Sequence, residues 1–155
     1  MPYRPFEGQN CSIARTLAIV GERWTLLIMR ELLLGRRRFE ELRRHTGVAT
    51  NILSDRLATL VDHGLVTHRG EPPEYRPTEK GRDLVPVLLA LMSWGDRYAA
   101  PEAGPPRVPV HTTCGHDAHP RLHCSHCGEP IAPREIRVRP GPGATVQQQT
   151  EPLLP

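Results

Sequence analysis

Residues with metal-ligand chemistry gather in one short stretch of the sequence, 110–130. It contains three of the four cysteines and five of the eight histidines. Within it, "HTTCG" and "CSHCG" follow one pattern: a ligand residue, two spacers, a second ligand and a glycine. Two ligands at this spacing bind one metal ion through a tight turn, and glycine admits the turn's backbone conformation. The pattern predicts a closed, structural Zn²⁺ site made by His111, Cys114, Cys124 and Cys127.

Other interpretations of this stretch stay open from the sequence. His116 competes with His111 for the fourth ligand position. Cys124 and Cys127 could form a redox pair, but the strand-helix context of such pairs is missing. The segment could also be an unliganded tail. A catalytic zinc would need an open coordination position and a general base in a pocket, and no such pocket is evident in the sequence.

Cys11 is the fourth cysteine and a candidate redox sensor. It lies in the first turn of a predicted helix, with Arg15 four residues on, and both features favour the thiolate. The competing interpretation is a small apolar residue packed at a subunit interface. No other cysteine precedes residue 114, so a disulfide partner must come from a second chain, the tail cysteines or a small thiol.

Composition divides the 155-residue chain into two parts. Eleven of the 17 prolines follow residue 98, where large apolar residues are also scarce. A segment of that kind needs a metal or stays loose, because it cannot bury enough apolar surface. The sequence therefore predicts a domain over 1–99, a proline-rich linker over 100–110, a zinc-binding appendage over 111–139 and a disordered tail over 140–155.

Charge and hydropathy restrict where the protein works. The formal net charge is +3. The excess of basic over acidic residues lies in residues 1–100, where arginines cluster in "GRRRFEELRRH". The chain opens without an apolar signal core, and its most apolar stretch, "WTLLIMRELLLG", is too short to cross a bilayer. We expect a cytoplasmic protein that does not enter membranes.

Hydrophobic periodicity predicts helices over 11–20, 22–34, 39–46 and 48–63, with Asn10 as the first N-cap. Two short strands follow over 65–70 and 74–78, with Pro77 at an edge or strand end. Thr78 caps a last helix over 79–99, which Pro86 should kink or break near Asp83. This order is typical of a mainly α, α+β winged helix-turn-helix fold with a small zinc-ribbon-like appendage.

The fourth helix has the pattern of a DNA-recognition helix. Its apolar stripe leaves short polar side chains outward near the N-terminus, as a helix in the major groove requires. Asn51 could pair with adenine, and Asp55 could accept from cytosine or orient Arg56. Thr50 and Ser54 could contact bases or phosphate. The plainer interpretation is an ordinary amphipathic surface helix.

Basic residues on both sides of this helix are candidates for phosphate contacts. Glu40 and Glu41 could instead pair with about half of the arginines around the preceding helix. The candidates in that region are Arg36, Arg37, Arg38, Arg43 and Arg44. Those in the strand pair are His68, Arg69 and Arg76.

Several blocks in a fixed order give the chain a family resemblance. They include "GERWTLLIMRELLLG", "RRFEELRR", "ATNILSDRL", "DHGLVTHR" and "YRPTEKG". Over residues 8–99 the sequence resembles the HxlR-type winged-helix transcriptional regulators. The resemblance implies a homodimer built mainly from the first and last helices and a pseudo-palindromic operator. It also implies that Cys11 matches a cysteine with which some members sense oxidants or electrophiles.

Two features depart from the family pattern. The wing between Arg69 and Tyr75 is short, acidic and contains two prolines, and Pro77 replaces an apolar strand residue. We nevertheless expect a regulator of double-stranded DNA, not an enzyme, modulated by an unidentified effector or by redox chemistry. The alternatives are a zinc-dependent enzyme that uses the His/Cys cluster and a winged helix used for protein contacts.

Overall fold

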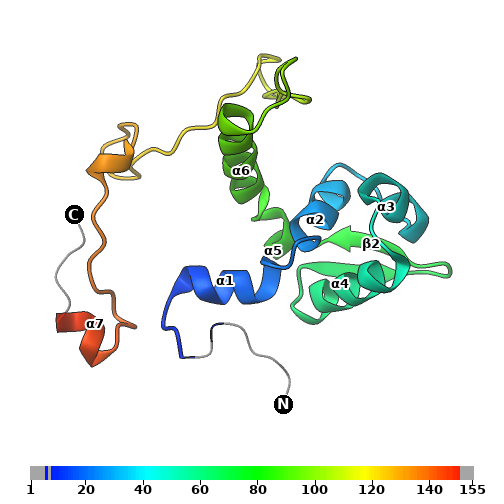
Figure 1. Cartoon of the computed structure of the whole chain (residues 1–155), viewed down its shortest axis with the longest axis horizontal. Helices are drawn as coiled ribbons and strands as arrows, with labels where there is room; N and C mark the ends of the chain where they lie inside the picture. Colours follow the sequence, from blue (N-terminus) through cyan, green and yellow to red (C-terminus); the bar gives the residue numbers. More distant parts are fainter. Residues whose placement is uncertain (1–5, 7, 151–155) are drawn as a thin grey trace. The chain divides into compact units, whose positions relative to one another are not determined.

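The computed structural model describes residue 6 and residues 8–150 (Figure 1). Contacts within the chain divide it into two units, one up to Leu89 and one from Ala90. The first unit contains α1 (Ser12–Val20), α2 (Thr25–Leu33), α3 (Phe39–Thr46), α4 (Thr50–Asp62), β1 (Val66–Arg69), β2 (Glu74–Pro77) and α5 (Glu79–Arg82). Helix α6 (Val85–Tyr98) begins in the first unit and ends in the second. The second unit also contains the 3-10 turn η1 (Pro133–Glu135) and α7 (Val146–Thr150), which lies in the tail segment 140–155.

The first unit confirms the winged helix-turn-helix prediction. Helices α3 and α4 are joined by a short turn in which Gly47 has a φ of 71°, in the left-handed region that favours glycine. The wing follows directly, with β1 and β2 antiparallel and Val66 paired with Pro77. Pro77 thus sits at the end of a two-stranded sheet, where a missing N–H is tolerated.

Two helix boundaries show which local signals prevail. The prediction that Asn10 caps α1 is wrong: Cys11 is the N-cap, and Arg15 donates to the Asn10 side chain instead. The predicted break in the last helix is confirmed, because α5 ends at Arg82 and α6 begins at Val85. Pro86 is then the second residue of α6, where its missing N–H leaves no helical hydrogen bond unmade.

Helix α2 is the centre of the hydrophobic core. It contacts α3, α4 and β2, and its Ile28, Met29 and Leu32 are fully buried. The apolar sides of its neighbours close the core with Leu42, Val48, Leu53, Leu57, Leu60, Leu65 and Val66. Because α4 contributes one face to this core, its other face must point to solvent.

A charged residue also enters this core. Glu31 of α2 is only 4% exposed, and its carboxylate forms ion pairs with Arg30 at 2.6 Å and Arg36 at 3.0 Å. An unpaired carboxylate at this depth would cost several kcal/mol. Glu31 therefore holds Arg36, and with it the segment that leads into α3, against α2.

The end of the wing is tied to α4 by Thr78 and Gly81. The Thr78 hydroxyl donates to the Gly64 carbonyl at 2.7 Å and accepts from the Gly81 amide at 3.1 Å. Gly81 is buried, and a Cβ there would lie 2.2 Å from the carbonyl oxygen of Leu65. Only glycine allows α5 to approach the end of α4 and the start of β1 this closely.

The second unit lacks a comparable core. Its described apolar side chains are largely exposed, among them Val110, Leu122, Ile136 and Val138. None of the helices within residues 8–150 combines the length and apolar character needed to cross a bilayer.

The packing of Gly81 predicts that Gly81→Ala lowers the free energy of unfolding by about 2 kcal/mol, because the new methyl group must displace backbone. Thermal and denaturant unfolding followed by circular dichroism measure the change. Gly141→Ala is the matched control, since a Cβ at Gly141 meets nothing within 4 Å. Equal stability of the two variants would show that the α5 contact is not tight.

Candidate nucleic-acid interface

Helix α4 presents the four polar residues of the recognition-helix prediction on its outer face. Thr50, Asn51, Ser54 and Asp55 are all exposed, while Leu53 and others on the opposite face are buried. Within the described residues, the side chains of these four form no hydrogen bond or ion pair. They are therefore free to exchange bound water for groups on a ligand.

The amino-terminal side of α3 is fixed by a carboxylate. Glu41 accepts hydrogen bonds from the backbone amides of Arg37 and Arg38 at 3.2 and 3.0 Å. These bonds, that of Arg38 first, hold the pKa of Glu41 below its ordinary value. The ionised carboxylate thus satisfies amides at the start of α3 and sets the direction in which the helix leaves the core.

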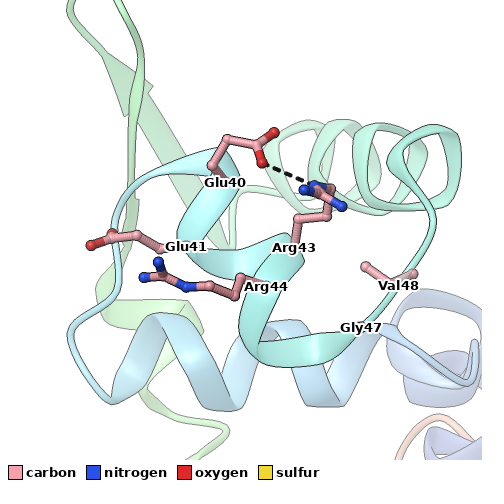
Figure 2. A pocket seen from close by; sticks show the side chains of 6 residues that line it. All are labelled: Glu40, Glu41, Arg43, Arg44, Gly47 and Val48. Carbon is pink, nitrogen blue, oxygen red and sulfur yellow. Dashed lines mark hydrogen bonds and ion pairs between the residues drawn. The ribbon is translucent and has the colours of Figure 1, made fainter.

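Two arginines on the exposed side of α3 face solvent beside the turn. Figure 2 shows Arg43 against the Glu40 carboxylate, with their ion pair at 2.9 Å. The open pocket in this view is lined by Glu40, Glu41, Arg43, Arg44, Gly47 and Val48. Both partners of the ion pair are exposed, so the pair contributes little to the stability of the fold. Arg43 can therefore exchange Glu40 for a phosphate.

Arg36 and Arg37, two of the predicted phosphate contacts, have partners inside the protein. Arg36 pairs with the buried Glu31 and is itself largely covered. The Arg37 guanidinium donates to the backbone carbonyls of Leu32 and Arg36. A phosphate contact at either residue would have to compete with these bonds.

Arg38 connects the start of α3 to the wing. Its guanidinium pairs with Glu74 at 2.9 Å and donates to the Pro72 carbonyl at 2.8 Å. Glu74 also binds Arg76 at 2.8 Å, and the hydrogen bond from Arg76, followed by the charge of Arg38, lowers the pKa of Glu74. One acidic residue of the wing therefore holds two of the predicted phosphate-binding arginines.

The rest of the wing leaves one arginine unpaired. His68 stacks on Tyr75 with ring centroids 5.9 Å apart, across the antiparallel strands. Arg69 is exposed at the tip, beside an open hollow lined by Arg38, Thr67, Arg69, Gly70, Glu71, Pro72, Glu74 and Arg76. In the part of the chain that the structure describes, Arg44, Arg56 and Arg69 form no ion pair.

Sequence reasoning missed the residues that position this surface. Glu31 and Glu74 decide which arginines have carboxylate partners within the protein, yet neither was among the candidates. The only sequence signal for Glu31 is an acidic residue in the middle of an apolar helix, which requires a buried partner. No local signal marks Glu74, because its partner Arg38 lies 36 positions earlier in the chain.

Cys11 lies away from this surface in the chain, at the N-cap of α1, and is exposed. The nearby backbone amides of Ala14 and Ile13 hold the pKa of the thiol below its ordinary value. Arg15 adds a smaller electrostatic effect in the same direction. In an exposed cysteine with a lowered pKa, a larger fraction of the thiol is present at neutral pH as the thiolate, which is the nucleophilic form.

The four predicted zinc ligands lie in the second unit as two pairs. His111 Nδ1 is 3.3 Å from the Cys114 sulfur. The nearby backbone amides of Cys127 and His126 lower the pKa of the Cys124 thiol. Within residues 8–150, no three His, Cys, Asp or Glu side chains lie close enough to bind one ion together. The structure thus forms both pairs without joining them.

The sequence of this chain is similar to those of transcriptional regulators. The HxlR-like helix-turn-helix family matches residues 19–103. An HTH-type transcriptional regulator of Mycobacterium tuberculosis, Rv3095, is 50% identical over 143 residues, which cover 89% of each chain. The family match ends at residue 103, and the similarity to that relative extends further along the second unit.

Solved structures share the fold. The crystal structure of PA1607, a candidate transcription factor, has a TM-score of 0.76 and 36% identity over 86% of this chain and 96% of that one. The redox regulator HypR in its oxidised form has a TM-score of 0.53 and 29% identity over 59% of this chain and 100% of that one. The chain is a helix-turn-helix transcriptional regulator and belongs to the HxlR-like family.

Proposed function

We propose that the protein is a homodimer that binds a pseudo-palindromic operator in double-stranded DNA, with α4 of each protomer in the major groove. The observation that carries the proposal is the outer face of α4, where Thr50, Asn51, Ser54 and Asp55 are exposed and unpaired within the described residues. In a homodimer, two such helices would enter successive major grooves about one turn of DNA apart.

The contacts divide into those that read bases and those that hold the backbone. Asn51 has the side-chain amide that pairs with both major-groove groups of adenine. Arg43 and Arg44 flank the turn that precedes α4, where they would bind phosphates and carry no sequence information. Arg36 and Arg38 would act indirectly, by fixing the loop before α3 and the wing.

The dimer surface that we propose includes α6. Val87, Leu91, Trp94 and Tyr98 follow one another at helical spacings of four, three and four, so they share one face. Three of them are more than half exposed, with Leu91 at 51%, Trp94 at 63% and Tyr98 at 61%. Exposure of such an apolar stripe to water is unfavourable, and the stripe is well suited to packing against the same helix of a second protomer.

Helix α1 has a second unpaired apolar face. Ile13 is 70% exposed and Leu17, one turn later, is 42% exposed. An apolar residue pair of this kind adds area to a subunit interface. Because Cys11 begins the same helix, a change at its sulfur would act next to the proposed dimer surface.

Modulation through Cys11 is part of the proposal. The thiol is exposed and its pKa is lowered by main-chain amides, which favours attack on oxidants or electrophiles. The relative HypR is named as a redox regulator and has been solved in an oxidised form. Modification of Cys11 would shift the spacing of the two α4 helices and thereby operator affinity.

The proposed role is binding without catalysis. The recognition helix and the dimer surface hold and position DNA, and no chemical step on a substrate is needed. We place this role in the cytoplasm, where a regulator of transcription meets its DNA.

Base reading by Asn51 predicts that Asn51→Ala loses about 1–3 kcal/mol of discrimination for the operator while non-specific binding persists. Arg43→Ala should instead weaken binding to all duplexes alike and reduce the salt dependence by about one counterion. Fluorescence anisotropy at several salt concentrations measures both, with Arg82→Ala as a control outside the α3–α4 face. If Asn51→Ala lost the same affinity for every DNA sequence, base reading by Asn51 would be refuted. If the unaltered protein failed to bind any duplex, a role in protein contacts would be favoured.

The apolar stripe on α6 predicts that a Leu91→Glu, Trp94→Glu variant becomes monomeric, because two carboxylates would be buried at the interface. Sedimentation equilibrium measures the assembly, and helical circular dichroism confirms that the variant folds. Ser93→Glu is the matched control, since Ser93 is exposed on another side of the same helix. A dimer that survives the double change would place the interface elsewhere.

The lowered pKa of Cys11 predicts that its alkylation rate rises with pH at a midpoint below that of glutathione. The sign follows from the thiolate fraction, which is larger at neutral pH when the pKa falls. Mass spectrometry of the peptide that contains Cys11 measures the rate. Operator binding by Cys11→Ser should resist oxidants that weaken the unaltered protein. A profile that overlays glutathione's would rule out activation of this thiol.

A further inference from the structure

The second unit contains one hairpin twice, with a repeat of 13 residues. The first copy spans 109–118 and the second spans 122–131. Each copy is closed by a single bridge, Val110 with Asp117 and His123 with Pro130. Outside each bridge the same hydrogen bond recurs, from Ala118 N to Pro109 O at 2.7 Å and from Ile131 N to Leu122 O at 2.9 Å.

The turns inside the two hairpins also share two backbone hydrogen bonds. The first ligand's amide donates across the turn, from His111 N to His116 O and from Cys124 N to Glu129 O, both at 2.9 Å. Its carbonyl then accepts from the turn glycine, from Gly115 N at 2.7 Å and Gly128 N at 2.9 Å. Both glycines lie in the left-handed region, with φ of 73° and 78°. Two segments of different sequence have thus adopted one backbone.

The repeat identifies which residues are equivalent. His111 takes the place of Cys124, and Cys114 takes the place of Cys127, so both hairpins offer two zinc-ligand residues on one tight turn. His116 takes the place of Glu129 instead, and its Nδ1 already donates to the Cys114 carbonyl at 2.8 Å. The geometry therefore favours His111 over His116 as the histidine ligand.

The apolar content of the segment cannot account for two ordered hairpins. Val108, Val110 and Leu122 are exposed, and no described side chain of the second unit, from Ala90 to Thr150, is buried. Small segments without a core usually depend on a metal or on disulfides for folding. The ligand pairs on the two turns, His111 with Cys114 and Cys124 with Cys127, are the groups that can supply that stabilisation.

We propose that the two hairpins together bind one Zn²⁺ ion through His111, Cys114, Cys124 and Cys127. Three thiolates and one imidazole form the closed tetrahedral set that structural zinc prefers. The three thiols release their protons to solvent as the ion binds. Because the two pairs are separate in the described residues, the connector over 119–121 must turn to bring the hairpins around the metal.

The test uses the full-length protein, purified in reductant and then measured for zinc by elemental analysis. We expect one zinc per chain. Co²⁺ exchanged into the site should give the visible bands of a tetrahedral ion and sulfur-to-metal charge-transfer bands that weaken with each Cys→Ser change. Amide exchange over 109–131 should slow when zinc is added to metal-free protein, because binding orders the connector.

Variants at equivalent positions separate ligands from neighbours. Cys114→Ser, Cys124→Ser and Cys127→Ser should each lose the metal at low free zinc, and His111→Asn should weaken its binding. His116→Asn and Cys11→Ser are the matched controls and should retain one zinc per chain. All readouts are independent of DNA, so they stand apart from the operator experiments.

Three results would overturn the proposal. The first is an absence of zinc from reduced protein that also fails to bind added Zn²⁺. The second is loss of metal from His116→Asn with retention by His111→Asn, which would refute the equivalence drawn from the repeat. The third is binding that needs Cys11, which would place the site outside the hairpins.

Discussion

The surface proposed to bind DNA depends on the burial of α2. Its apolar residues bring α3, α4 and β2 onto one helix, so the side of α4 that does not face α2 must face solvent. The same helix carries Glu31 into the core, where its charge has to be paired. That requirement holds Arg36 and the loop before α3, which sets the position of the helix-turn-helix relative to its core.

The arginines around α3 therefore have two roles. Arg36 pairs with the buried Glu31 of α2, and Arg38 pairs with Glu74 of the wing, so both have a carboxylate partner that fixes a neighbouring segment. Arg43 has only an exposed carboxylate as its partner, so its charge remains available to a polyanion. Ion pairs that fix the loop before α3 and the wing therefore stand next to an arginine whose only partner is exposed.

The two units obtain their stability from different sources. The first buries a continuous apolar cluster and closes it with the tight Gly81 contact. The second exposes most of its apolar side chains and has regular backbone chiefly in its short helices and in two equivalent hairpins. Burial of apolar surface accounts for the first unit, and metal coordination is our proposal for the second.

The sequence by itself determined the order and type of the elements as far as α6, because helical spacing, left-handed glycines such as Gly47 and the position of Pro86 act within a few residues. It also showed which face of α4 would be polar and which residues pair at metal-ligand spacing. Only the tertiary structure decided that Arg38 meets Glu74 and that Gly81 lies against Leu65. Such contacts join residues far apart in the chain, and no local pattern encodes them before the core has brought them together.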